Sequence, residues 1–439
     1  MKTIIRLFGL IFTLFMLISC GTNRKTNRAI TSAFNDSLYF DQGFAGLSIY
    51  DPVEKKMLYT YNANKYFTPA SNTKLLTFYT GLTILGDSVP ALKYRISGDS
   101  LIFRGTGDPS LLNPDLPPSK IMDFLRYRTE CLFYEVPSYI ETYFGPGWSW
   151  DDYDAYYSVE RVAYPIYANR VTFTQGEKSG IPKAYPYFYQ KDLILDSLKL
   201  DKTDRLSRKM VENEFFYQLA VRDTTFRQEV PIKYSPELFV EVLADTLKKE
   251  VGLITEFKKF HREEKTLYSI PTDSLYGRML KVSDNFLAEQ VLLLASGVIA
   301  DTLKTSIAID YMKKNALQQL PDEPQWVDGS GLSRYNLQTP SNMIKILELI
   351  TKKMPLEKVI QLLPTGGESG TLEDHYSANE SYIFAKSGSL SNNYSLSGFI
   401  KTKSGKTLIF SFMNSNYTIP TSTLKKGMEN ILLKIRDNY

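Results

Sequence analysis

Histidine and cysteine are scarce in this sequence. Each occurs twice among 439 residues, as His261 and His375 and as Cys20 and Cys131. Two distant histidines cannot supply the H-E-x-x-H cluster of a zinc peptidase, so we expect no metal site. The sequence also lacks a G-x-S-x-G nucleophile elbow, which argues against a Ser-His-Asp hydrolase. We therefore interpret both histidines as surface or structural residues.

Charge of one sign is not in large excess either. The net charge is +4, and Lys and Arg are spread along the chain, so no nucleic-acid partner is predicted. The glycine pair Gly366-Gly367 is not followed by Lys-Ser/Thr in P-loop spacing, which excludes that phosphate site. A hydrophobic content of 43% with 13% aromatics indicates a globular protein, and the length predicts two or three domains.

One apolar run stands out, Leu7 to Ile18, and it is too short to span a membrane comfortably. Lys2 and Arg6 precede it, as in an export signal. The residues that follow resemble a bacterial lipobox: Leu17-Ile18-Ser19-Cys20-Gly21. We predict a lipoprotein signal peptide at 1–19.

Lipidation of Cys20 would attach the protein to a membrane through the lipid alone, with residues 20–28 as a short polar tether. A plain secretory signal with an accidental cysteine is the alternative. Lipidation leaves Cys131 without a partner, so no disulfide is expected in spite of export. The predicted location is the periplasm, as a membrane-anchored lipoprotein.

Strand-like runs occur at both ends of the chain, over 46–50, 56–61, 394–402 and 406–413. Helical patterns cover 283–295, 306–320, 341–353 and 421–436. We therefore expect an α+β fold in which both ends build one antiparallel sheet flanked by helices. The catalytic part is predicted at 29–95 plus 264–439.

The stretch between these parts, 96–263, is rich in Tyr, Phe, Pro and short alternating runs, such as Tyr185-Pro186-Tyr187-Phe188-Tyr189. It predicts one or two inserted β-rich domains. The tyrosines are interpreted as a small β-rich core, with stacking on glycan sugars as the alternative.

Ser71 and Lys74 lie three residues apart in Ser71-Asn72-Thr73-Lys74, at the head of an apolar helical run from Leu75 to Leu85. Residues three apart share a helix face, so the lysine amine can reach the serine hydroxyl. A serine needs an adjacent base to act as a nucleophile, and a buried lysine can be that base. Alone, the tetrapeptide is weak evidence, and an ordinary helix start with an exposed lysine is the better interpretation.

Two further motifs follow in the order that this chemistry requires. Ser283-Asp284-Asn285 opens a second apolar helix, and Lys386-Ser387-Gly388 ends a strand-like run from Tyr382 to Ala385. S-x-x-K, S-D-N and K-T-G together are typical of class A β-lactamases and penicillin-binding proteins. The trio indicates a serine acyl-transfer site.

Several more blocks make the chain similar to the penicillin-binding protein 4 type of D-alanyl-D-alanine carboxypeptidase/endopeptidase. They are Gly105-Thr106-Gly107-Asp108-Pro109-Ser110-Leu111, Gly145-Pro146-Gly147-Trp148-Ser149-Trp150-Asp151-Asp152, Asp328-Gly329-Ser330-Gly331-Leu332-Ser333 and Gly370-Thr371-Leu372. The resemblance implies a β-lactamase/transpeptidase-like domain with a large insertion between the first two motifs. Ser387 departs from the usual Thr but keeps the hydroxyl.

The resemblance also implies roles. Ser71 would attack a D-Ala-D-Ala-like peptide bond, Lys74 would take its proton, and Ser283 would relay a proton to the leaving amine with help from Lys386. Asn285 would bind the substrate amide, and Ser387 with Lys386 the terminal carboxylate. The backbone N–H groups of Ser71 and Ser389 would form the oxyanion hole. No cofactor is required.

Asp152 falls on the family's aspartate that faces the substrate side chain. A carboxylate at the cleft mouth would pair with the amine of diaminopimelate in peptidoglycan stem peptides. The alternative is that Asp152 caps a turn beside Asp151 and Asp154. The expected partners are peptidoglycan peptides, with β-lactams as covalent inhibitors. A β-lactamase-like hydrolase and a non-catalytic wall-binding lipoprotein stay open as other functions.

Overall fold

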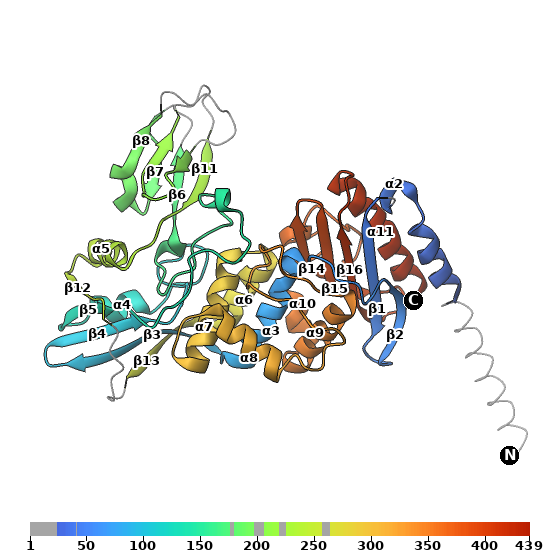
Figure 1. Cartoon of the computed structure of the whole chain (residues 1–439), viewed down its shortest axis with the longest axis horizontal. Coiled ribbons are helices and arrows are strands. Elements are labelled where there is room, and N and C mark those ends of the chain that lie inside the picture. Colours follow the sequence, from blue (N-terminus) through green and yellow to red (C-terminus); the bar gives the residue numbers. More distant parts are fainter. Residues whose placement is uncertain (1–23, 41, 176–179, 197–205, 219–224, 257–263) are drawn as a thin grey trace, which may run out of the picture.

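The computed structural model describes residues 24–40, 42–175, 180–196, 206–218, 225–256 and 264–439. Two bodies lie along the long axis of the molecule, the catalytic part and the inserted part (Figure 1). A group of helices lies between the sheet of the catalytic part and the strands of the inserted part. The predicted signal peptide, the lipidation site Cys20 and His261 lie outside the described residues.

The catalytic sheet has five antiparallel strands in the order β14-β15-β16-β1-β2, so the two ends of the chain meet in it. β1 pairs with β16, with Leu47 opposite Phe412. The strands are β1 Phe44–Asp51, β2 Lys56–Tyr61, β14 Ile383–Leu390, β15 Asn393–Lys401 and β16 Thr407–Ser415. The predicted antiparallel sheet built from both chain ends is confirmed.

Helices cover both faces of this sheet. On one face the amphipathic helix α11, Thr421–Asn438, buries an apolar stripe together with the helical residues 24–33 and α2, Ser37–Phe40. On the other face α9, Pro340–Lys353, contacts β1, β15 and β16. The remaining helices of this part are α3 Lys74–Ile84, α6 Thr272–Lys281, α7 Asn285–Ala300, α8 Thr305–Asn315 and α10 Leu356–Leu362.

The inserted part has a second hydrophobic core and three sheets. The largest has the order β12-β5-β4-β3-β13, in which β4-β5 and β5-β12 pair in parallel. Its strands are β3 Ser88–Ser97, β4 Ser100–Gly105, β5 Cys131–Glu135, β12 Val251–Ile254 and β13 Lys265–Pro271. The exposed Cys131 begins β5.

Two small sheets and two helices complete the insertion. Their orders are β11-β6-β7 and β8-β10-β9. The strands are β6 Arg170–Gln175, β7 Lys183–Tyr185, β8 Leu193–Leu195, β9 Leu206–Arg208, β10 Phe215–Tyr217 and β11 Phe226–Pro231. The helices are α4 Ile121–Arg126 and α5 Pro236–Leu247.

The chain enters and leaves the insertion through the paired strands β3 and β13. Beside this crossing, the Thr272 N–H donates to Asp87 O at 3.0 Å. The predicted boundary at 95/96 falls inside β3, and the one at 263/264 falls just before β13. The division into domains stays a prediction. The strand pairing favours junctions at Ser88, where β3 begins, and at Pro271, where β13 ends.

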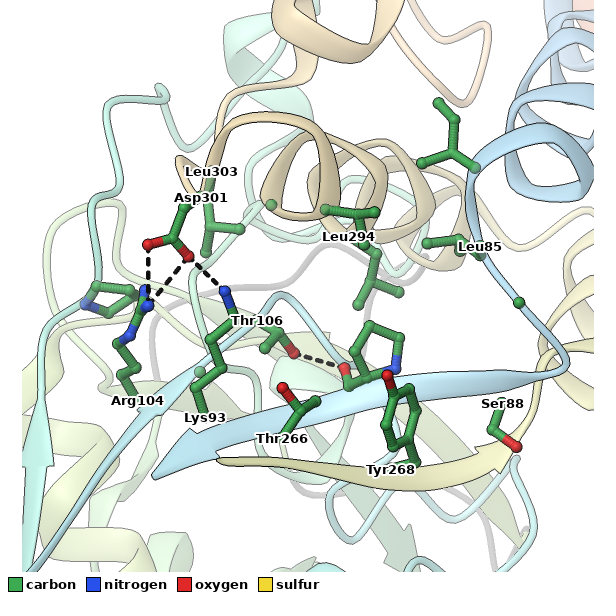
Figure 2. Close-up of a pocket in the computed structure, with 17 residues that line it drawn as sticks. Leu85, Ser88, Lys93, Arg104, Thr106, Thr266, Tyr268, Leu294, Asp301 and Leu303 are labelled. Carbon is green, nitrogen blue, oxygen red and sulfur yellow. Dashed lines mark hydrogen bonds and ion pairs between the residues drawn. The ribbon is translucent and has the colours of Figure 1, made fainter. Parts of the chain in front are cut away.

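An ion-pair cluster joins the insertion to the catalytic part. Asp301, the left-handed residue that ends α7, accepts from Lys93 at 2.6 Å and from Arg104 at 3.0 Å (Figure 2). Arg104 also pairs with Glu264 at 2.6 Å. A cavity of about 310 Å³, lined largely by apolar side chains, lies beside this cluster.

The predicted tether 20–28 differs from the structure where the two overlap. Residues 24–33 are helical, and Thr26 and Ile30 are 5% and 0% exposed. The reason is that this helix packs its apolar side against the sheet with α11, so residues 24–28 belong to the folded body. None of the helices in the described part of the chain has the length and apolar character that a membrane span requires.

Candidate active site

Ser71 and Lys74 are in direct contact. Ser71 lies in the short 3-10 helix η1, Ala70–Thr73, and Lys74 is the first residue of α3. The Lys74 Nζ donates to Ser71 Oγ at 2.9 Å, to Asn285 Oδ1 at 2.6 Å and to Ser330 O at 2.7 Å. The first and second motifs therefore meet at one nitrogen atom, although they are far apart in the sequence.

The surroundings of Lys74 set its protonation. The side chain is 0% exposed, and burial lowers the Lys74 pKa to about 8, although Asp328, Asp284 and Glu289 favour the charged form. An amine with a pKa near 8 is neutral in part of the molecules at neutral pH. Such an amine can accept the proton of the neighbouring hydroxyl.

Two buried carboxylates behind Lys74 were not predicted as site residues. Glu289 accepts from the Ser330 N–H at 2.7 Å and lies 3.6 Å from Arg161, and burial with the charge of Asp328 raises the Glu289 pKa to about 7. Asp328 accepts from the Gly331 N–H at 2.8 Å. Its other donors are the Ser333 N–H at 2.7 Å, Asn336 Nδ2 at 2.8 Å and Trp148 Nε1 at 2.9 Å.

A signal for both carboxylates exists in the sequence. Glu289 follows Asn285 by four residues, one helical turn, so both lie on the same face of α7. Asp328 opens the block Asp328-Gly329-Ser330-Gly331, to which we assigned no role. Gly331 has φ +82°, and a Cβ there would lie 1.9 Å from Ala70 O, so this block packs directly against η1.

The second motif lies at the start of α7. Asp284 accepts from the Leu287 N–H at 3.0 Å and so caps the helix, while Ser283 has φ +63°. Asn285 Nδ2 donates to Tyr157 O at 2.9 Å, and its Oδ1 accepts from Lys74. Both ends of the Asn285 amide are therefore oriented before substrate arrives.

The third motif lies on β14, the edge strand of the catalytic sheet. Lys386 is 0% exposed, and its Nζ donates to Ser387 O at 2.7 Å. Burial and the neighbouring Lys74 charge hold the Lys386 pKa well below its ordinary value. The Ser387 hydroxyl is 2.6 Å from that of Thr371, a residue that was not predicted as part of the site.

β14 lies directly against η1. Asn72 Nδ2 donates to Lys386 O at 3.1 Å and to Ser395 O at 3.2 Å. A Cβ at Gly388 would lie 2.4 Å from Pro69 O and 2.9 Å from Ser71 N. Only a residue without a side chain fits there, and this close approach brings the third motif beside Ser71.

A pocket of about 770 Å³ unites most of the predicted residues. Lys74 and Lys386 lie buried behind it. Its lining includes Ser71, Asp152, Ser283, Asn285, Ser387 and Ser389.

Asp152 lies in the 3-10 helix η2, Trp150–Asp152, at the side of the pocket formed by the insertion. Its carboxylate accepts from Tyr157 Oη at 2.8 Å. Burial, together with this hydrogen bond, raises the Tyr157 pKa to about 12. The contact orients Asp152 toward the pocket residues and leaves its recognition role as a prediction.

The described histidine and the acidic residues form no metal centre. His375 Nε2 lies 3.0 Å from Lys425 Nζ. Within the described ranges, no three His, Cys, Asp or Glu side chains lie close enough together to hold a metal ion.

Comparison with known proteins extends the similarity across the chain. The curated D-alanyl-D-alanine carboxypeptidase DacB of Haemophilus influenzae is 31% identical over 170 residues, 34% of this chain and 33% of that protein. The penicillin-sensitive carboxypeptidase A of Dictyostelium discoideum is 22% identical over 432 residues, 84% of this chain and 81% of that protein. The match to the Haemophilus protein thus spans about a third of its length.

A solved structure shares the fold. The crystal structure of penicillin binding protein 4 (dacB) from Haemophilus influenzae superposes with a TM-score of 0.72 at 19% identity, covering 93% of this chain and 99% of that one. Residues 27–435 match the sequence profile of the D-Ala-D-Ala carboxypeptidase 3 (S13) family. The predicted fold class and the predicted relationship are confirmed, and the chain belongs to the D-Ala-D-Ala carboxypeptidase 3 (S13) family of serine hydrolases.

Proposed function

We propose that this protein is a serine-type D-Ala-D-Ala carboxypeptidase, with DD-endopeptidase activity on cross-links, that acts on peptidoglycan stem peptides through an acyl-enzyme on Ser71. The observation that carries the proposal is the 2.9 Å contact between Lys74 Nζ and Ser71 Oγ in a site where burial lowers the Lys74 pKa to about 8. Membership of the family supports the same reaction.

In acylation, Ser71 Oγ attacks the carbonyl carbon of the penultimate D-Ala and Lys74 Nζ takes the hydroxyl proton. The carbon–nitrogen bond then breaks. Ser283 relays the proton held by Lys74 to the departing amine, with help from Lys386, so Lys74 becomes neutral again. Water attacks the resulting ester, with Lys74 as base, and releases the shortened peptide.

The negative oxygen that forms during attack would be held by the backbone N–H groups of Ser71 and Ser389. The closeness of Gly388 to Ser71 N supports this pairing, because it brings the two backbone segments within contact distance. Oxyanion donors contribute about 2.7–4 kcal/mol each in other serine hydrolases. Asn285, fixed by Lys74 and Tyr157, would bind the substrate amide.

Asp152 would recognise the amine of a diaminopimelate side chain. Its position on the lining of the pocket, oriented by Tyr157, supports that role. The pairing is partly exposed and is worth about 1 kcal/mol. Asp152→Asn should lower turnover of diaminopimelate peptides and spare acylation by benzylpenicillin, which lacks the amine. Equal losses on both would assign Asp152 to the fold.

Action outside the cytoplasm follows from a peptidoglycan substrate, and the lipobox at Cys20 supports anchoring by lipid. Mass analysis of the purified wild type should show a lipid on Cys20, and Cys20→Ser should lack it. A wild type without that lipid would refute lipidation.

Covalent labelling by a fluorescent penicillin tests the reaction. Ser71→Ala should abolish labelling, whereas Ser404→Ala, in the exposed turn between β15 and β16, should label like the wild type. A labelled Ser71→Ala protein would refute the nucleophile. A wild type that never labels would favour a non-catalytic wall-binding protein, and rapid nitrocefin turnover would favour a β-lactamase-like hydrolase. Mass analysis of products from purified peptidoglycan measures the carboxypeptidase and endopeptidase shares.

A further inference from the structure

A lysine of the last helix lines the active-site pocket. Lys425 belongs to α11, whose neighbouring Leu424 and Met428 are buried against the catalytic sheet. The Lys425 side chain is half-buried and shares the pocket lining with Ser71, Ser387 and Ser389. A single residue of α11 therefore reaches the site from a helix whose apolar stripe serves the core.

Two contacts locate its ammonium group. Lys425 Nζ is 3.0 Å from His375 Nε2 and 4.9 Å from the centre of the Tyr394 ring. Tyr394 is the partner of Ser389 in the β14–β15 pairing. The lysine thus lies beside the end of the third motif, between β15 and the loop that follows Thr371.

Lys425 has no carboxylate partner within the described ranges, whereas Lys345, Lys352, Lys358 and Lys406 each form an ion pair. Burial lowers the Lys425 pKa from its usual value, and burial with the Lys425 charge lowers the His375 pKa. A neutral His375 can accept a hydrogen bond at Nε2, which orients the ammonium without cancelling its charge. The cation is held in place and stays free to meet an anion.

A carboxylate bound at the third motif requires a nearby positive charge, and Lys386 is poorly placed to supply it. Lys386 is completely buried and donates to Ser387 O, and its pKa lies far below the ordinary lysine value. Its Nζ is hydrogen-bonded to a backbone carbonyl, and its side chain is not part of the pocket lining, so a carboxylate in the pocket does not meet it directly. Arg334 also lines the pocket, but it is exposed and donates to Ser391 O at 3.2 Å, so solvent screens its charge.

A pair of hydroxyl groups, those of Thr371 and Ser387, lines the same pocket as Lys425. Thr371 and Ser387 share one hydrogen bond of 2.6 Å. Two hydroxyls carry two protons and this contact uses one, so the other proton can be donated to a carboxylate oxygen. Neutral donors and one cation together match a single carboxylate.

We propose that Lys425 is a specificity residue that binds the C-terminal carboxylate of the peptide substrate, with the free hydroxyl proton of the Thr371–Ser387 pair as a second donor and His375 as the group that positions the amine. The inference rests on the proposed carboxypeptidase function. In this proposal Lys425, and not Lys386, supplies the positive charge that binds the C-terminal carboxylate of the substrate.

The test uses one peptide in two forms, an N-acylated D-Ala-D-Ala peptide with a free C-terminal carboxylate and the same peptide as its C-terminal amide. The full-length wild type should prefer the free acid in kcat/KM. Lys425→Met should lower kcat/KM for the acid by about 10-fold or more, as a charged hydrogen bond predicts, and leave the amide within about twofold. Lys425→Arg should keep most of the preference, and Lys425→Gln should lose it as Met does.

Lys426→Met is the matched control, because Lys426 is the next residue of α11 and is exposed. It should leave both rates unchanged. The unchanged amide rate in Lys425→Met also shows that the variant folds. An equal fall on both substrates, or an unchanged acid-to-amide ratio, overturns the role of Lys425 alone. A wild type that cleaves neither peptide overturns the proposed function and this inference together.

Discussion

The two sides of the active site treat a buried lysine differently. On the helical side, burial lowers the Lys74 pKa to about 8, and the carboxylates of Asp328, Asp284 and Glu289 oppose a further fall. Lys386, on the strand side, is equally buried, and burial and the charge of Lys74 hold its pKa well below the ordinary value. The two lysines are equally buried, so the difference in their pKa comes from the acids near Lys74, which have no counterpart among the groups that act on Lys386.

This contrast assigns different chemistry to two identical side chains. An amine with a pKa near 8 can both take and return a proton within the working pH range. An amine whose pKa is held well below the ordinary value carries its positive charge less readily and attracts anions more weakly. Both lysines donate to a backbone carbonyl, Ser330 O for Lys74 and Ser387 O for Lys386, and Lys74 also contacts the nucleophile.

The largest effect is expected when each lysine is replaced in turn. Lys74→Ala should slow acylation by fluorescent penicillin about 1,000-fold, since general bases contribute roughly 10²–10⁴-fold. Lys386→Met, which keeps the volume of a neutral buried side chain, should slow it less, by about 10- to 100-fold. Second-order acylation rates measure both, and circular dichroism checks the fold. Equal losses would erase the distinction between the two sides.

The second test separates the sides physically. Gly388→Ala would place a Cβ 2.4 Å from Pro69 O, so β14 must move away from η1. The expected result is at least a 10-fold loss of acylation rate and about 1–3 kcal/mol of stability. Gly86→Ala is the control, because a Cβ at Gly86 has no atom within 4 Å. Normal acylation by Gly388→Ala would show that the site tolerates a wider gap.

A third test concerns pH. The active form of Lys74 is the deprotonated one, so the acylation rate should rise with pH and level off above an apparent pKa of about 8. Glu289→Gln removes a negative charge that favours the ammonium form, so the profile should shift to lower pH, by less than about one unit. Stopped-flow acylation rates between roughly pH 6 and 10, about two units on either side of this pKa, measure the profile. A shift to higher pH would contradict the assigned electrostatics.

The smallest effect is expected far from both lysines. Asp301→Asn keeps a residue that tolerates the left-handed conformation but removes the pairs with Lys93 and Arg104. Because Asp301 is partly exposed, urea unfolding should show a loss of about 1 kcal/mol, with acylation unchanged. Asp245→Asn, which breaks an exposed pair with Lys248, should cost close to nothing. An altered acylation rate in Asp301→Asn would mean that the junction influences the site.

Sequence reasoning worked where a feature is local. S-x-x-K places Ser71 against Lys74 because helical spacing alone brings them together, and the runs at both chain ends are strand-like in their local sequence. It did not identify Glu289, Asp328 or Thr371 as site residues, since their importance comes from contacts across the fold. The boundary predicted at 95/96 falls inside β3, because the pairing of β3 with β13 is a contact between distant segments that local patterns do not reveal.

The pairing of β1 with β16 has a consequence for biosynthesis. These strands come from residues 44–51 and 407–415, so the central sheet cannot close until nearly the whole chain has been made. The insertion, with its own core, consists of residues that are all made before β16. Its contacts are nearer in sequence, so it should assemble first, and the late sheet closure should be the slow step in maturation. A chain interrupted before β16 would then carry a folded insertion and an open edge at β1, a ready target for proteolysis or aggregation.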